Sequence, residues 1–375
     1  MPKLYGRNWT PEELRSRTGG AEQLAGVERV ILDDGSARGV RAANLRTGAG
    51  LEVQVLLDRA LDLGRASFRG RSLAYQAPCG TVHPAFYDSQ GLNWLRTFGC
   101  GLMVTCGLQN VGVPCEDEGQ SFGLHGGISA TPADELSVQS GWKGAQCRFR
   151  IAGRMREVTP RGLFGPNLAL TRSISSALGA HWIEIEDVVE NEGFAPSALM
   201  LLYHINLGFP LLDEGGRVLL AASKTEPRDA AARAGWAHWS RVEAPQAGYR
   251  EQVFAHEMIA GPRGRARAAL VAPQRPGGEA LGLCLEYDAN ALPRFTQWKM
   301  LGAGAYVMGL EPANCTVLGR AEERRRGTLQ TIAPGERRTF RLKLSVLSSA
   351  DEIVALETEL AALQGRGGRR QRGRR

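Results

Sequence analysis

The chain has 375 residues, of which 43% are hydrophobic and 23% are charged, a balance that is typical of globular proteins and excludes extensive disorder. The formal net charge is +7, but six arginines lie within the last eleven residues, GRGGRRQRGRR, so the rest of the chain carries only 7 − 6 = +1. A nearly neutral body argues against a protein built to bind nucleic acid.

We expect neither an export signal nor a membrane span. The first residues, MPKLYGRNWTPEEL, contain no apolar stretch of signal-peptide length, and no segment reaches the roughly 20 apolar residues of a membrane span. The seven cysteines are odd in number and lack CxxC spacing, so we interpret them as reduced core thiols. We therefore expect a soluble, cytoplasmic protein.

Helices are predicted only near the two ends of the chain. Thr10 and Glu13 have the spacing of a capping box, with a proline at the first helical position, and residues 1–24 are predicted to form an N-terminal helical extension. Ser349 and Glu352 repeat the box before DEIVALETELAAL, which predicts a C-terminal helix over residues 349–363. The Gly/Arg segment 364–375 is predicted to be disordered.

The region between these helices has the pattern of antiparallel strands. Apolar and polar residues alternate over 51–57, 147–151 and 340–346, which is typical of sheets with one solvated face. Turn signals separate the apolar runs at DDGS, NEGF and DEGG, and residues 227–240 and 261–267 are predicted long loops. Without a repeat or a linker, residues 25–348 are predicted to form one all-β domain.

One predicted strand, in the segment YHINLGFP, carries two polar side chains on one face. Alternation puts Tyr203 and Ile205 on the apolar face, and His204 and Asn206 on the opposite face. Burying an unpaired imidazole or amide costs a few kcal/mol, so both side chains need hydrogen-bond partners or a polar cavity. A satisfied core histidine and a site histidine both fit this segment.

Two other segments carry chemically useful residues. In FGLHGGISATP, His125 precedes Gly126 and Gly127, and paired glycines allow a sharp turn that displays the imidazole. In YVMGLEPAN, Glu311 ends an apolar run, where burial would raise its pKa toward the range of a general base. Glu311 alone would fit a structural ion pair equally well.

Taken together, these segments resemble the aldose 1-epimerase (galactose mutarotase) superfamily, and within it an uncharacterised aldose-epimerase-like branch. The phrases LDRALDLG, LMVTCGLQNVG, LHGG, LYHINLGFP and LEPAN carry the resemblance, which spans about residues 25–348. LHGG is similar to the family's first histidine motif, the strand of His204 to its second, and LEP to the motif of its catalytic glutamate. Characterised members have a Tyr-Phe insertion after the second histidine, which is absent between His204 and Asn206.

The resemblance implies a fold and a reaction. The expected fold is a large antiparallel β-sandwich of the galactose mutarotase type with short terminal helices. The expected reaction interconverts the anomers of a free monosaccharide by general acid/base ring opening, with Glu311 as the base and protonated His204 as the acid on opposite sides of the sugar. His125 would hydrogen-bond the ring-oxygen side, and neither a metal nor a cofactor is implied.

Sugar binding requires polar groups around an apolar face. The predicted substrate-binding residues, besides His125, are Arg59, Asp62, Arg96, Asn110, Asn206, Asp288, Gln297 and Lys299, with Trp298 as a stacking surface. For each of these taken singly, a structural role is at least as well supported by the sequence. Arg59 and Asp62, for example, are three residues apart and could pair with each other.

Other functions fit parts of the same pattern. A glycoside hydrolase or lyase would use Glu311 with a second acid such as Asp288, and a non-catalytic sugar-binding or sensor module would keep the cleft without turnover. Nucleic-acid binding through the arginine-rich tail would be lost in high salt. We expect a small-molecule sugar as the partner, with no membrane and no specific nucleic acid, and a homodimer remains open.

Overall fold

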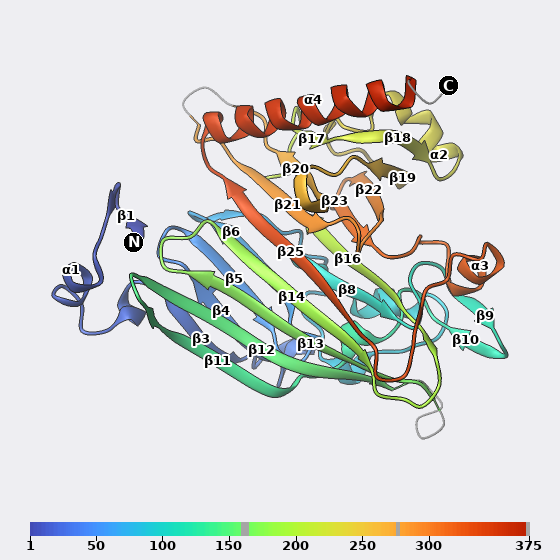
Figure 1. Cartoon of the computed structure of the whole chain (residues 1–375), viewed down its shortest axis with the longest axis horizontal. Helices are drawn as coiled ribbons and strands as arrows, with labels where there is room; N and C mark the ends of the chain where they lie inside the picture. Colours follow the sequence, from blue (N-terminus) through green and yellow to red (C-terminus); the bar gives the residue numbers. More distant parts are fainter. Residues whose placement is uncertain (159–164, 275–277, 373–375) are drawn as a thin grey trace.

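The computed structural model describes residues 1–158, 165–274 and 278–372 of the chain. Two large antiparallel sheets lie against each other and form a β-sandwich (Figure 1). This arrangement confirms the predicted all-β fold.

The larger sheet has eleven strands. In spatial order they are β18 (Ala222–Pro227), β19 (Gln252–Met258), β22 (Arg294–Gly302), β23 (Ala305–Ala313), β16 (Met200–Leu207), β8 (Met103–Leu108), β6 (Asp62–Phe68), β5 (Leu51–Leu56), β4 (Arg41–Arg46) and β3 (Gly26–Ile31), with β7 (Arg71–Ser72) paired to β6.

The smaller sheet has eight strands. Their order is β11 (Asp134–Lys143), β12 (Gln146–Val158), β13 (Asn167–Ala177), β14 (Trp182–Asn191), β25 (Arg337–Leu347), β21 (Gly282–Asp288), β20 (Arg265–Val271) and β17 (Arg217–Leu220). Three short hairpin or bridging pairs complete the strands: β1 (Lys3–Leu4) with β2 (Arg7–Asn8), β9 (Cys115–Asp117) with β10 (Gln120–Phe122), and β15 (Ser197–Ala198) with β24 (Thr331–Ile332).

The main apolar core fills the space between the two sheets. It includes the inward side chains of the three segments whose alternation predicted strands, for example Val53 on β5, Phe149 on β12 and Leu342 on β25. Each such side chain contributes about 1.5–3 kcal/mol by leaving water. A second apolar cluster, which includes Trp94, Phe98 and residues of β8 and β16, lies outside this main core.

Both predicted capping boxes are present. The Thr10 hydroxyl accepts from the Glu13 N–H at 3.1 Å, and the Glu13 carboxylate accepts from the Thr10 N–H at 2.8 Å. Ser349 and Glu352 exchange the same two hydrogen bonds, each at 3.2 Å. They open the short helix α1 (Pro11–Arg15) and the long helix α4 (Ala350–Arg372).

The C-terminal helix is longer than predicted. Residues 364–372, predicted to be disordered, continue α4, and the last three residues of the predicted tail lie outside the described residues. Leu356 and Leu360 pack on the smaller sheet against Ala269 and Cys284, as Figure 1 shows for the helix as a whole. The Gln364 side chain also bonds both backbone groups of Ala222, which extends the anchored part beyond residue 363.

Helices also occur inside the chain, where none was predicted. The predicted loop 227–240 contains α2 (Ala230–Ala234), whose first turn is capped by the Asp229 carboxylate, and α3 (Arg320–Arg325) follows Gly319. Within the described ranges, no helix is both long and apolar enough to cross a membrane. All seven cysteines are free, and Cys79 is exposed rather than part of the core.

Candidate active site

His204 and Glu311 lie side by side on neighbouring strands of the larger sheet. In the antiparallel pair of β16 and β23, Ile205 is opposite Leu310. The residue before Ile205, His204, is therefore opposite Glu311. Their side chains are only 7% and 3% exposed, and His204 Nε2 lies 3.3 Å from Glu311 Oε1.

The predicted orientation of His204 is confirmed by the packing of its strand. Tyr203, Ile205 and Leu207 belong to the main core between the sheets. His204 points to the other face, where its ring meets the edge of Phe98 with centroids 5.3 Å apart. Loops that cover this face bury the imidazole without placing it in the main core.

Gly309 leaves room for the histidine-glutamate pair. It pairs with Asn206 on one side and with Trp298 on the other, two residues before Glu311 on β23. A Cβ atom at this position would overlap Glu311 Oε1 and would lie 3.0 Å from Trp298 Cβ and 3.3 Å from His204 Cε1. The missing side chain is thus what allows the carboxylate to bend toward the imidazole.

His125 approaches the pair from a loop. Its backbone has a φ of +58°, a left-handed conformation that is uncommon outside glycine, and is held by two hydrogen bonds. The His125 N–H donates to Gly112 O at 3.0 Å, and Gly107 N–H donates to His125 O at 2.9 Å. The imidazole centroid lies 5.9 Å from that of His204, in an edge-to-face arrangement. The two histidines and the glutamate therefore converge.

Burial keeps both histidines neutral near pH 7. It lowers the pKa of His125 to about 4 and, together with the proximity of His125, lowers the pKa of His204 to about 3. The Gly112 N–H points to His125 Nδ1 at 3.4 Å. Because that nitrogen accepts, the single proton of the neutral His125 ring is on Nε2, which becomes a hydrogen-bond donor.

Glu311 has the opposite shift. Burial, with a smaller contribution from the charge of Glu251, raises the pKa of Glu311 to about 8, and Arg228 opposes this effect. Neither His204 Nδ1 nor Glu311 Oε1 makes a hydrogen bond within the described part of the chain, although both atoms are buried. Unsatisfied buried polar atoms are costly. Two such atoms on neighbouring side chains with shifted pKa values are a feature of ligand-binding sites.

Aromatic side chains surround the pair. Trp298 meets the ring of His204 edge-on, with centroids 5.4 Å apart, and its indole N–H donates to Glu251 at 2.9 Å. On the other side, Trp94 stacks on Phe98 with centroids 4.3 Å apart. The structure thus places Trp298, the predicted stacking surface, beside the catalytic candidates.

Arg59 and Asn206 lie near the pair but have protein partners. Arg59 is buried and donates to Val82 O at 2.8 Å; it lines a cavity of about 10 Å³ together with Val104, the residue opposite His204 on β8. Asn206 donates to His204 O at 2.9 Å, while its amide oxygen is buried without a partner. Asn206 therefore braces the strand next to the histidine.

Asp62 belongs to a charged network inside the sandwich. Its Oδ1 accepts from the Thr105 N–H at 3.0 Å and lies 3.1 Å from Arg172. Arg172 also contacts both oxygens of Asp187, at 2.8 and 2.6 Å, and Tyr203 donates to Asp187 at 2.7 Å. These contacts join the two sheets through Oδ1. Within the described residues, Asp62 Oδ2 is buried without a hydrogen-bond partner, and Asp62 lines the same small cavity as Arg59.

Two residues of β22 predicted to bind sugar face away from the pair. Gln297 donates to Trp239 O at 2.8 Å and contacts His256 at 3.1 Å. Lys299 donates to His238 O at 2.8 Å and pairs with Glu243 at 2.7 Å. Since side chains alternate along a strand, only Trp298 between them faces the pair.

The remaining predicted residues lie in loops or in the other sheet. Asn110 is fully buried and bonds Gly123 O at 2.8 Å and the Arg320 N–H at 2.8 Å, so it shapes the loop before His125. Asp288 ends β21 in the smaller sheet and accepts from the Asn290 N–H. Arg96 is exposed on the short helical turn Asn93–Thr97, next to Trp94.

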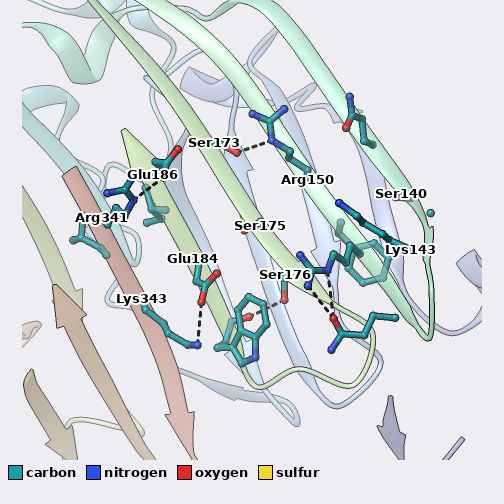
Figure 2. A pocket seen from close by; sticks show the side chains of 18 of the residues that line it. Ser140, Lys143, Arg150, Ser173, Ser175, Ser176, Glu184, Glu186, Arg341 and Lys343 are labelled. Carbon is teal, nitrogen blue, oxygen red and sulfur yellow. Dashed lines mark hydrogen bonds and ion pairs between the residues drawn. The ribbon is translucent and has the colours of Figure 1, made fainter. Parts of the chain in front are cut away.

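A large cavity lies elsewhere, on the outer face of the smaller sheet. It measures about 1080 Å³, and Figure 2 shows that charged side chains from neighbouring strands cover it. Glu186 pairs with Arg341 at 2.7 Å and Glu184 with Lys343 at 3.0 Å. Because these charges satisfy one another and no histidine lines the cavity, chemistry is better supported at the buried pair. Within the described residues, no group of three or more acidic, histidine or cysteine side chains could hold a metal ion.

Sequence reasoning missed Trp94, Phe98 and Gly309, whose roles arise from contacts between distant segments. Glu157, a buried carboxylate that bonds the backbone next to His125, was also missed. A signal for it existed, since Glu157 shares the inward phase of Phe149 and Ile151 on β12.

Solved structures share this fold. A protein from Klebsiella pneumoniae subsp. pneumoniae MGH 78578, provisionally described as an aldose 1-epimerase, is 27% identical with a TM-score of 0.84, over 92% of this chain and 90% of the other. Galactose 1-epimerase from Lactobacillus acidophilus NCFM is 13% identical with a TM-score of 0.55, over 87% and 99%. A galactose mutarotase-like protein from Clostridium acetobutylicum is 11% identical with a TM-score of 0.57, over 87% and 99%.

These likenesses confirm the resemblance to the aldose 1-epimerase and galactose mutarotase fold. No curated protein matches the chain. A family model does match it over residues 37–346, and the chain therefore belongs to the family described as "Domain of unknown function (DUF4432)".

Proposed function

We propose that the protein is a carbohydrate isomerase that interconverts the anomers of a free monosaccharide by general acid/base ring opening. The observation that carries the proposal is the buried pair of His204 and Glu311, 3.3 Å apart. His125 and Trp298 beside it would supply a hydrogen-bond donor and an apolar surface for a sugar ring. The fold shared with a galactose 1-epimerase supports the same chemistry.

The adjacency of the two groups suits this reaction. The sequence led us to expect His204 and Glu311 on opposite sides of the substrate, but the structure puts them next to each other. Ring opening removes the proton of the anomeric hydroxyl and protonates the ring oxygen, and both oxygens are bonded to the same carbon. Two neighbouring groups can therefore reach both oxygens at once.

The pair has the right number of protons. With the pKa of Glu311 raised to about 8 and that of His204 lowered to about 3, the pair holds one proton at pH 7. One member can then accept the hydroxyl proton while the other gives its own to the ring oxygen, and the count is unchanged. These pKa values put the proton on Glu311, so Glu311 would be the acid toward the ring oxygen and neutral His204 the base toward the hydroxyl. This is the reverse of the roles that the resemblance implied. Each group would accelerate the reaction by about 10²–10⁴-fold.

His125 would orient the sugar. Its neutral ring presents a donor at Nε2, since Nδ1 accepts from the Gly112 N–H. A donor toward the ring oxygen would stabilise the negative charge that develops as the ring bond breaks. His125 keeps this role over a wide pH range because its pKa is about 4.

A panel of free aldoses and ketoses, followed by polarimetry, tests the proposal. An isomerase accelerates anomer exchange of at least one sugar, a hydrolase releases reducing ends from a glycoside, and a sensor binds without turnover. Asp288, the second acid expected for a hydrolase, lies in the smaller sheet, away from Glu311. Binding of a sugar without any acceleration would replace the isomerase with the sensor.

A further inference from the structure

Glu157 is a buried carboxylate on the last inward position of β12. Phe149, Ile151 and Met155 share its phase on this strand and belong to the main core, whereas Glu157, only 8% exposed, continues the row with a charged group. A carboxylate in such a position is costly unless hydrogen bonds compensate its lost hydration. The hydrogen-bond partners of Glu157 therefore indicate its role.

The carboxylate bonds two backbone segments of the opposite layer. Its Oε2 accepts from the Leu108 N–H at 2.7 Å, and its Oε1 accepts from the Gly127 N–H at 3.3 Å. Leu108 ends β8, and Gly127 lies two residues after His125. Among the described residues, no cation lies within ion-pair distance of Glu157, and Arg320 acts only through its more distant charge.

Both segments lead directly to His125. The Gly126–Gly127 peptide is held at both ends, because Tyr87 donates to Gly126 O at 2.9 Å while the Gly127 N–H donates to Glu157. The residue before Leu108, Gly107, donates to His125 O at 2.9 Å. A Cβ atom on Gly126 would overlap Gly107 O, so the two segments are in close contact.

We infer that Glu157 is a positioning residue: its carboxylate, reaching from the smaller sheet, ties the loop of His125 to the end of β8 and so aims the His125 imidazole at His204. The ionised carboxylate offers two acceptor oxygens and no donor, so it accepts fully from both N–H groups. Protonation or amidation puts a donor on one of the two positions and weakens the hydrogen bond to the N–H group that it faces. The catalytic consequence rests on the proposed function, whereas the hydrogen-bond consequence does not.

The ionisation of Glu157 falls in the neutral range. Burial raises its pKa to about 7, against the effect of its backbone hydrogen bonds and of Arg320. The other groups that face it stay in one state there, since the pKa of Tyr87 is raised by burial and by Glu157 itself, and His125 has a pKa of about 4. The two hydrogen bonds from the Leu108 and Gly127 N–H groups to Glu157, which we call the clamp, are therefore complete above pH 7 and weaken as the pH falls through about 7.

Amide NMR of the full chain tests the clamp without any substrate. In the wild type, the Leu108 and Gly127 amide signals should shift together with a midpoint near pH 7. Glu157→Gln should abolish this shift. Glu186→Gln is the control, because Glu186 is an outward, half-exposed carboxylate on β14 of the same sheet. This variant should leave the shift of the two amide signals unchanged. A wild type whose two amides do not respond, or a shift that persists in Glu157→Gln, would overturn the inference.

Kinetics test the consequence for catalysis. In the wild type the rate should decline below pH 7. Glu157→Gln should remove this decline and lower kcat/KM by about 10- to 100-fold, as small misplacements of catalytic groups do. Full activity with the wild-type pH profile would contradict a positioning role. If Glu157→Gln does not fold, the wild-type amide titration still decides. If no sugar turns over, that result counts against the proposed function and leaves the amide test standing.

Discussion

His204 Nε2 lies 3.3 Å from Glu311 Oε1, on adjacent strands and almost out of contact with water. The two residues are more than one hundred positions apart in the chain, and the antiparallel register of β16 and β23 makes them neighbours. Gly309 keeps the space between them open. This pair is the structural basis for the proposed acid/base chemistry.

The rate of anomer exchange should fall as the pH rises through about 8. Glu311, with its raised pKa of about 8, then loses the one proton that the pair shares, and no acid remains for the ring oxygen. A kcat/KM profile from about pH 7 to about pH 10, measured by NMR, checks this limb. A rate that stays constant across this range would show that the proton of Glu311 is not used.

Glu311→Gln should be more stable than the wild type, and the difference should grow with pH. The pKa of Glu311 is raised from 4.5 to about 8 in the folded state, so the folded protein binds more protons than the unfolded chain between these values. Wild-type stability attributable to Glu311 is therefore lost as the pH rises from about 4.5 to about 8. Thermal melts of both proteins at several pH values test this. A difference in melting temperature that narrows with rising pH would contradict the prediction.

Gly309→Ala should abolish activity while leaving the fold intact. The new methyl group would overlap the Glu311 carboxylate and press on His204, which separates the pair. Gly141→Ala is the matched control, because Gly141 is also a strand glycine but its Cβ would meet nothing within 4 Å. Equal activity of the two variants would show that contact between His204 and Glu311 is dispensable.

Arg172→Met should destabilise the protein by about 3–5 kcal/mol, because it leaves two buried carboxylates without their cation. Arg172 contacts Asp62 and Asp187 with none of these side chains more than 2% exposed. The control, Arg341→Met, breaks a pair whose side chains are about half exposed, and should cost about 0–1 kcal/mol. Urea unfolding measures both, and similar losses would refute a structural role for the Arg172 network.

Local patterns predicted the fold well. Period-two alternation located β5, β12 and β25, and the capping boxes located α1 and α4, because these signals depend only on neighbouring residues. The same alternation gave the outward face of His204. The resemblance of three short motifs pointed to His125 and Glu311, whose catalytic role stays a prediction. These predictions needed no knowledge of which strands pair.

The contacts of the predicted binding residues were harder to predict. Gln297 and Lys299 flank Trp298, and alternation, a local signal, already puts them on the opposite face, but their partners Trp239 O and Glu243 come from distant segments. Asp62 is drawn into an ion-pair network by Arg172, which no local pattern connects to it. The walls of the site, Trp94 and Phe98, come from a loop whose placement depends on the whole larger sheet.

The acid/base role of Glu311 is tested most directly by the anomer-exchange rate of a free monosaccharide, measured by magnetisation-transfer NMR with wild type, Glu311→Gln and Glu184→Gln at equal concentration. We expect exchange in the wild type and in Glu184→Gln, whose carboxylate lies on the outer face of the smaller sheet. Glu311→Gln should be slower by about 10²–10⁴-fold. Exchange at the same rate in wild type and Glu311→Gln would show that Glu311 is not a catalytic residue.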